Sequence, residues 1–155
     1  MKAEERIREL GIDLPVSSPP GAMYIPVTRI GDALFVAGQI PARDGVPVYT
    51  GKLGSQRDLE YGQEAARLCA INLLAALRAY LGDLDHIHSF AKLQVFVASE
   101  VGFDKQHLVA NAASELLYDV FGERGRHART AVGVNQLPLD VTVEIEAIVK
   151  VREGV

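Results

Sequence analysis

One arginine and two glutamates near the end of the chain have the types and spacing that small-anion chemistry needs. Residues 129–151 are predicted to form two strands joined by a turn at residues 137–140. The second strand alternates, so Glu144 and Glu146 point to one face, while Arg129 begins the preceding strand. A guanidinium and a carboxylate row on a half-polar sheet face could bind a small anion and position a water molecule.

Each of these side chains also has a purely structural interpretation. Arg129 could pair with an acidic neighbour instead of clamping a carboxylate or phosphate with two parallel hydrogen bonds. Glutamates on strands are usually solvated, but burial of Glu144 beside Glu146 would raise one pKa and suit a general base or a water-positioning group. Gly38 interrupts a predicted strand, which indicates a bulge or a close backbone approach by a ligand.

Other reactive side chains give weaker signals. His86 and His88 form a His-x-His pair without a third ligand at a suitable spacing, so we expect no metal. The glycines match no phosphate-binding or dinucleotide-binding loop, and no cofactor is expected. Cys69 falls within an apolar helical pattern and is expected to be a core residue. A single cysteine cannot form an internal disulfide, which favours the cytoplasm.

The composition favours one globular domain over residues 1–155. Hydrophobic residues make up 48% and charged residues 23%, and no apolar run reaches the length of a membrane span. The N-terminal residues form a charged helical pattern rather than a signal peptide. The net charge of −4 disfavours binding to nucleic-acid phosphates. Nucleic acid is therefore not an expected partner.

The elements that would position the candidate residues follow from periodicity and punctuation. They are a helix over 2–10, strands over 24–30 and 32–40, a long connection over 41–57, a helix over 59–81, a strand over 88–98, a helix over 103–121 and the two strands of 129–151. Ser55 and Asp58 resemble a capping box before the first long helix. Gly82 and Gly122 are expected to end the two long helices.

This order of elements predicts an α+β fold with two long helices packed on one face of a single sheet. The strand over residues 33–38 is apolar on both faces, and no remaining element can cover the second face of the sheet. A partly apolar, uncovered face usually marks a subunit interface. We therefore expect a homo-oligomer, with Glu144 at or near the interface.

Two motifs resemble the RidA/YjgF superfamily, which is also known as endoribonuclease L-PSP. Residues 129–148 read Arg-Thr-Ala-Val-Gly-Val-x-x-Leu-Pro-x-Asp-Val-x-Val-Glu-Ile-Glu-Ala-Ile and resemble its C-terminal signature. Residues 35–41 read Phe-Val-Ala-Gly-Gln-Ile-Pro and resemble its early strand. The pair Val109-x-Asn111 also matches, and the resemblance covers roughly residues 22–151.

The resemblance implies a trimer of chorismate-mutase-like α+β subunits with ligand sites in the clefts between subunits. It implies hydrolysis of reactive 2-imino and enamine acids, such as 2-aminoacrylate, to 2-keto acids and ammonia without a cofactor. By the same resemblance, Arg129 would clamp the substrate carboxylate with help from the backbone N–H of Gly38. Glu144 would hold the attacking water, Tyr24 would line the pocket, and Asn111 would lie near the cleft.

Several positions depart from the family pattern, and the run over residues 62–72 resembles a divergent branch of the superfamily. Ala37 occupies the position of a pocket serine in the family. Ala131 lies two residues after the arginine, where the family often has a cysteine, and it would be part of the substrate-binding site. Residues 1–21 form an N-terminal extension, and the segment over 122–128 is longer than in the archetype. The resemblance assigns no role to residues 125–128 or to the extension.

Two other functions compete with the deaminase. A non-enzymatic protein could use the same cleft to bind a small carboxylate, and Glu144 discriminates because a binder needs no water-holding carboxylate. The family's ribonuclease label is the third hypothesis. Metal-free RNA cleavage needs a general acid and base together with groups that neutralise phosphate, and the acidic chain disfavours it.

Overall fold

The computed structural model describes residues 2–155, which contain three α-helices, seven strands and three 3-10 turns. The helices are α1 (Ala3–Glu9), α2 (Leu59–Leu81) and α3 (Gln106–Phe121), and the turns are η1 (Leu84–His86), η2 (Gly122–Gly125) and η3 (Pro138–Asp140). The strands are β1 (Val27–Ile30), β2 (Ala33–Gln39), β3 (Ala42–Arg43), β4 (Val46–Pro47), β5 (Ile87–Ala98), β6 (Ala128–Val134) and β7 (Val143–Val151). The predicted α+β class is confirmed.

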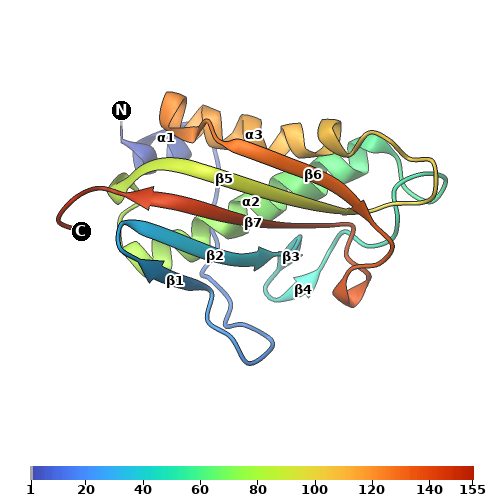
Figure 1. Cartoon of the computed structure of the whole chain (residues 1–155), viewed down its shortest axis with the longest axis horizontal. Helices are drawn as coiled ribbons and strands as arrows, with labels where there is room; N and C mark the ends of the chain where they lie inside the picture. The colour runs from blue at the N-terminus through green and yellow to red at the C-terminus, as the bar shows by residue number, and fades with distance from the viewer. Residues whose placement is uncertain (1) are drawn as a thin grey trace.

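Five strands form one mixed sheet in the order β1-β2-β7-β5-β6, and β3 and β4 form a separate hairpin. Every neighbouring pair in the large sheet is antiparallel except β5 and β6, which are parallel. The two strands predicted within residues 129–151 are therefore not neighbours. Figure 1 shows β5 lying between the orange β6 and the red β7.

Both long helices pack on one face of the sheet. Helix α2 contacts β7 and β2, α3 contacts β5 and β6, and the two helices contact each other. Figure 1 shows α2 crossing behind the sheet and α3 running along its β6 edge. Alternate strand residues fill the core between these layers, including Leu34, Leu93 and Ile145, which are fully buried. Each such side chain contributes about 1.5–3 kcal/mol to folding.

No helix of residues 2–155 packs on the opposite face of the sheet. Here Phe35 and Val132 each remain 40% exposed, and Ile148 is half-buried between polar neighbours. The strand over residues 33–38 does present apolar side chains to both faces, because Leu34 and Val36 are in the core while Phe35 is outside. We call the sheet face without helices, which carries Phe35, Val132 and Ile148, the open face. None of the helices in residues 2–155 is both long and apolar enough to span a bilayer.

Helix α2 has the predicted bounds but a different N-terminal cap. The Asp58 carboxylate accepts a hydrogen bond from the Tyr61 N–H at 2.9 Å and is itself the cap. Ser55 instead donates its hydroxyl and its N–H to Glu100, at 2.9 Å and 2.6 Å. The capping-box prediction was wrong because Ser55 binds Glu100, two residues beyond the end of β5, instead of the start of the helix. Gly82 ends the helix with φ of 78°, as predicted.

The starts of two elements and the content of the long connection differ from the sequence prediction. Strand β1 begins at Val27 rather than at residue 24, because Pro26 has no N–H for a ladder. Helix α3 begins at Gln106 rather than at residue 103. The long connection contains the β3–β4 hairpin, in which Asp44 and Gly45 both have positive φ.

Candidate functional site

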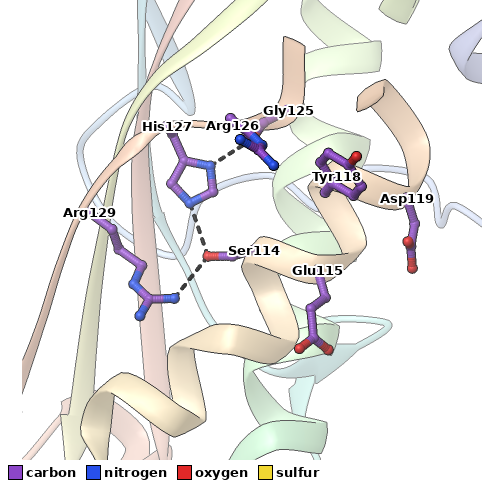
Figure 2. A pocket seen from close by; sticks show the side chains of 8 residues that line it. All are labelled: Ser114, Glu115, Tyr118, Asp119, Gly125, Arg126, His127 and Arg129. Carbon is purple, nitrogen blue, oxygen red and sulfur yellow. Dashed lines mark hydrogen bonds between the residues drawn. The ribbon is translucent and has the colours of Figure 1, made fainter. Parts of the chain in front are cut away.

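Arg129 lies on the edge strand β6 and turns toward the helices. Its register partner is Leu93, a core residue beneath the helices, so both side chains share that face. The Nη1 group of Arg129 donates to Asn111 Oδ1 and to Ser114 Oγ, both at 3.0 Å. The Nη2 group donates to the His107 carbonyl oxygen at 3.1 Å. The guanidinium is thus held against α3, and Figure 2 shows its contact with Ser114.

The spacing on α3 explains why three acceptors meet one guanidinium. Residues 107, 111 and 114 are separated by four and three positions, which places them along one side of the helix. We call these three residues the α3 stripe. A guanidinium has five N–H donors, and three are used here. Within residues 2–155 the Nε–H and one Nη2–H have no partner. A fixed cation with two remaining donors suits a carboxylate.

Glu144 lies on the other face of the sheet. Its register partner on β5 is Phe96, while that of Arg129 is Leu93, and the ladder is regular between these two positions. Residues three apart on a strand point to opposite faces. Arg129 therefore does not share the carboxylate face, and that interpretation was wrong. The reason is the parallel pairing of β6 with β5, which places Arg129 opposite a core residue.

The Glu144 carboxylate lies against the backbone of Gly38. The pairing of β2 with β7 shifts register between Val36 and Gln39, which is a β-bulge at the position where the sequence indicated one. A Cβ at Gly38 would overlap the carboxylate, so only glycine permits this approach. Burial raises the pKa of Glu144, and the neighbouring charge of Glu146 raises it further.

The remaining candidates, Ala131, Asn111 and Tyr24, lie on β6, on α3 and before β1. Ala131 is half-buried and shares the face of Arg129 two residues along β6. Asn111 touches Arg129 directly. Tyr24 is 49% exposed in the chain before β1, at the opposite edge of the sheet from β6. One chain thus joins Arg129 with Asn111 and Glu144 with Gly38, but it does not bring the two pairs together.

Two side chains beside Arg129, those of Ser114 and His127, were not among the predicted site residues. His127 Nε2 lies 3.0 Å from Ser114 Oγ, and its Nδ1 lies 2.7 Å from the Gly125 carbonyl oxygen (Figure 2). Burial lowers the pKa of His127, the hydrogen bond to Gly125 opposes this, and the charge of Arg129 lowers it further. The available signal was the spacing of His127 two residues before the arginine.

These side chains border an open hollow between α3 and the start of β6. Its volume is about 440 Å³. The lining residues are Ser114, Glu115, Tyr118, Asp119, Gly125, Arg126, His127 and Arg129. The hollow carries charges of both signs, and Arg129 lies at one end of it (Figure 2).

Comparisons with known proteins cover almost the whole chain. The model of a protein family described as "YjgF/chorismate mutase-like, putative endoribonuclease" matches residues 4–149. Protein TCP17 of Trypanosoma cruzi is 44% identical over 147 residues, which are 94% of this chain and 92% of TCP17. The matched span of the family includes Gly38, Arg129 and Glu144.

Solved structures share the fold. The crystal structure of Atu1372 from Agrobacterium tumefaciens is 48% identical with a TM-score of 0.90, and the match covers 97% of this chain and 92% of that one. The crystal structure of Escherichia coli TdcF with bound serine is 25% identical with a TM-score of 0.61, covering 89% and 94%. The chain is thus more similar to Atu1372 than to TdcF over a comparable length.

Proposed function

The chain belongs to the YjgF/chorismate mutase-like family, the RidA/YjgF superfamily, and from that premise we propose that it hydrolyses reactive 2-imino and enamine acids to 2-keto acids and ammonia. The site is a cleft between two copies of the chain in a cytoplasmic homotrimer, and it needs no cofactor. The observation that carries the proposal is the fixed guanidinium of Arg129, with two N–H donors left for a substrate carboxylate.

The ligand class follows from this guanidinium. Two parallel N–H donors on a planar cation match the two oxygens of a carboxylate. The related TdcF was solved with bound serine, a small molecule that carries a carboxylate beside an amine. A 2-imino acid has the same carboxylate beside a C=N bond, so this relative supports the proposed substrate class.

The arrangement of the sheet supports a site shared by two copies. Arg129 and Glu144 lie on opposite faces, so a single chain cannot present both to one small substrate. In a closed ring, the open face of one subunit can meet the β6 edge of the next. The exposed Phe35 and Val132 on the open face favour coverage by another subunit.

The substrate needs little activation by the protein because an imine carbon is already electrophilic. Arg129 fixes the substrate carboxylate, and Glu144 of the neighbouring copy holds a water and accepts its proton as the oxygen bonds to the carbon. Glu144 passes this proton to the nitrogen, and the proton of the new hydroxyl also moves to the nitrogen. The C–N bond then breaks, ammonia leaves, and the hydroxyl oxygen becomes the keto oxygen of the 2-keto acid. A raised pKa makes Glu144 a better proton acceptor near neutral pH.

Mixing two impaired variants is the sharpest test of a shared site. Arg129→Ala and Glu144→Gln should each keep about a tenth of the wild-type rate or less, because each lacks one half of every cleft. Refolded together in equal amounts, they should regain about a quarter of the wild-type rate, since a cleft needs an intact arginine from one copy and an intact glutamate from the next. The assay generates imino acids with an amino-acid oxidase and follows the release of ammonia.

The same assay separates the competing functions. Wild-type protein that binds pyruvate but does not accelerate imine hydrolysis over solution would favour a carboxylate-binding protein. Cleavage of RNA that survives in Arg129→Ala and Glu144→Gln would favour a separate ribonuclease site, against the net charge of −4. An inactive mixture of the two variants, beside an active wild type, would contradict the shared cleft.

Gly38→Ala is expected to slow imine hydrolysis by roughly tenfold to a hundredfold while the fold is retained. The new Cβ would overlap the Glu144 carboxylate and displace it from the bulge. The backbone at this glycine does not have positive φ, so alanine causes no backbone strain. Gly21→Ala is the matched control, because a Cβ there meets nothing within 4 Å. An unchanged rate in Gly38→Ala would show that the carboxylate position is unimportant.

A further inference from the structure

The hydroxyl of Ser114 lies between a cation and a histidine. Its Oγ is 3.0 Å from Arg129 Nη1 on one side and 3.0 Å from His127 Nε2 on the other. The other ring nitrogen of His127 is 2.7 Å from the Gly125 carbonyl oxygen. Figure 2 shows these contacts as one continuous path from Arg129 through Ser114 and His127 to Gly125.

The chemistry of the path fixes the direction of each hydrogen bond. A carbonyl oxygen only accepts, so Nδ1 of His127 carries a hydrogen in both charge states of the ring. In the neutral ring, Nε2 therefore accepts, and the Ser114 hydroxyl donates to it. The Ser114 oxygen in turn accepts from Arg129, which can only donate. Each of the three hydrogen bonds along the path then pairs one donor with one acceptor.

Protonation of His127 reverses one bond in this path. Nε2 gains a hydrogen and donates to Ser114, whose oxygen then accepts from two cations at once. The Ser114 hydrogen must turn elsewhere, and the positive charges of His127 and Arg129 oppose each other across one hydroxyl. An anion bound to Arg129 would offset this repulsion, so the charged ring is more favourable when the site is occupied.

We propose that His127 is a positioning residue that sets the hydrogen bonding of Arg129 through Ser114 and takes up a proton when a small carboxylate binds. The inference rests on the proposed carboxylate site but not on turnover. Because the occupied protein holds more protons, affinity for the carboxylate rises as pH falls through the titration range of His127, and it levels off on either side. Burial is the main cause of the lowered pKa of His127, and the charge of Arg129, which a bound carboxylate would offset, lowers it further.

The other titratable and charged groups around His127 lie on α3 and on its own segment. From α3, Glu115, Tyr118 and Asp119 line the same hollow, and Glu115 and Asp119 point away from the ring in Figure 2. On its own segment, Arg126 is paired with Glu123 at 3.4 Å. Carboxylates, tyrosines and arginines ordinarily titrate outside about pH 5 to 8, whereas histidine titrates within it. Histidine is therefore the residue type of this cluster that suits a change of charge in that range.

The test measures pyruvate binding by calorimetry between about pH 5.5 and pH 8, in two buffers with different ionisation enthalpies. Pyruvate stays ionised over this range. Wild-type protein should bind with uptake of a fraction of a proton, and its Kd should tighten by about threefold or more toward low pH. In His127→Asn, whose amide can still donate to Gly125, the proton uptake and the pH dependence should both disappear.

Two controls separate this linkage from a structural effect. His107→Gln removes the other histidine ring of the α3 stripe but keeps the carbonyl that Arg129 contacts, so it should retain the pH dependence. A second readout needs no ligand: in Arg129→Ala, the pKa of His127 followed by NMR should move upward, because a neighbouring charge has gone.

The outcomes distinguish this inference from the proposed function. Pyruvate binding without proton uptake, or a pH dependence that survives in His127→Asn, overturns the role of His127 and leaves the deaminase proposal standing. Absence of pyruvate binding at every pH overturns both. Loss of imine hydrolysis alone, with proton-linked binding intact, overturns only the proposed reaction.

Discussion

Arg129→Ala is expected to weaken pyruvate binding by about a hundredfold or more, since two hydrogen bonds to a charged group contribute about 3 kcal/mol or more together. The fold should persist, because Arg129 is half-exposed on an edge strand and its partners on α3 can turn to water. Calorimetry measures the affinity and circular dichroism the fold. Full affinity in this variant would place the carboxylate site elsewhere.

Two further arginine variants show whether charge or shape matters. Arg129→Lys keeps the charge, but one ammonium cannot contact Asn111, Ser114 and the His107 carbonyl while also presenting two parallel donors to the ligand. It should therefore restore little affinity. Arg126→Ala removes another arginine from the same hollow, whose side chain is 69% exposed, and it should leave pyruvate binding almost unchanged.

Glu144→Gln is expected to slow imine hydrolysis by on the order of tenfold or more and to change pyruvate binding much less. An amide can no longer accept the proton of the attacking water, whereas the carboxylate of the ligand is held by Arg129. The expected loss of rate is smaller than the largest losses seen when acid–base groups are removed, because an imine is a reactive substrate. A variant as fast as an active wild type would remove Glu144 from the mechanism and leave Arg129 acting with backbone groups.

Glu146→Gln is the matched control for Glu144. It lies on the same face of β7, opposite Gln94, and its charge raises the pKa of Glu144. Its replacement should leave the maximal rate nearly intact and move the acidic limb of the pH–rate profile to lower pH. A profile that did not move would show that the two carboxylates are not coupled.

A measurement of the melting temperature separates a loss of rate in Glu144→Gln from unfolding of the variant. The folded-state pKa of Glu144 is raised, so its contribution to stability is fully present below the unfolded pKa and is lost as pH rises through the folded pKa. At neutral pH the ionised, half-buried carboxylate therefore destabilises the fold. Glu144→Gln removes that charge, and its melting temperature at neutral pH should equal or exceed that of the wild type.

The sequence predicted the elements better than their order in the sheet. Helix α2 has the predicted bounds because apolar periodicity, Asp58 and Gly82 all mark it locally. The place of β6 depends on a crossover: β5, α3 and β6 form a strand–helix–strand unit, which allows parallel pairing. Adjacency in the sequence favoured β6 beside β7 instead. A β-bulge such as that at Gly38 is predictable because glycine in a strand has few other roles.

The candidate site was predictable in its parts but not in its arrangement. The matched motifs named Arg129 and Asn111 separately, and the structure joins them by a hydrogen bond within one chain. Which face Arg129 occupies depends on its register with Leu93, and no local pattern of β6 specifies that register. His127 precedes the strand, so its contact with Ser114 depends on the turn of η2.

The separation of Arg129 and Glu144 on two faces of one sheet also bears on how such a protein can evolve. On the proposed arrangement, recognition belongs to the α3 stripe and the edge strand, while the water chemistry belongs to the bulge and the open face. A substitution at residue 111 or 114 alters what is captured without disturbing the carboxylate at the bulge. A substitution at Gly38 alters the reaction without changing the anchor. Ligand preference and catalytic power can therefore drift independently, and lineages can lose one while keeping the other.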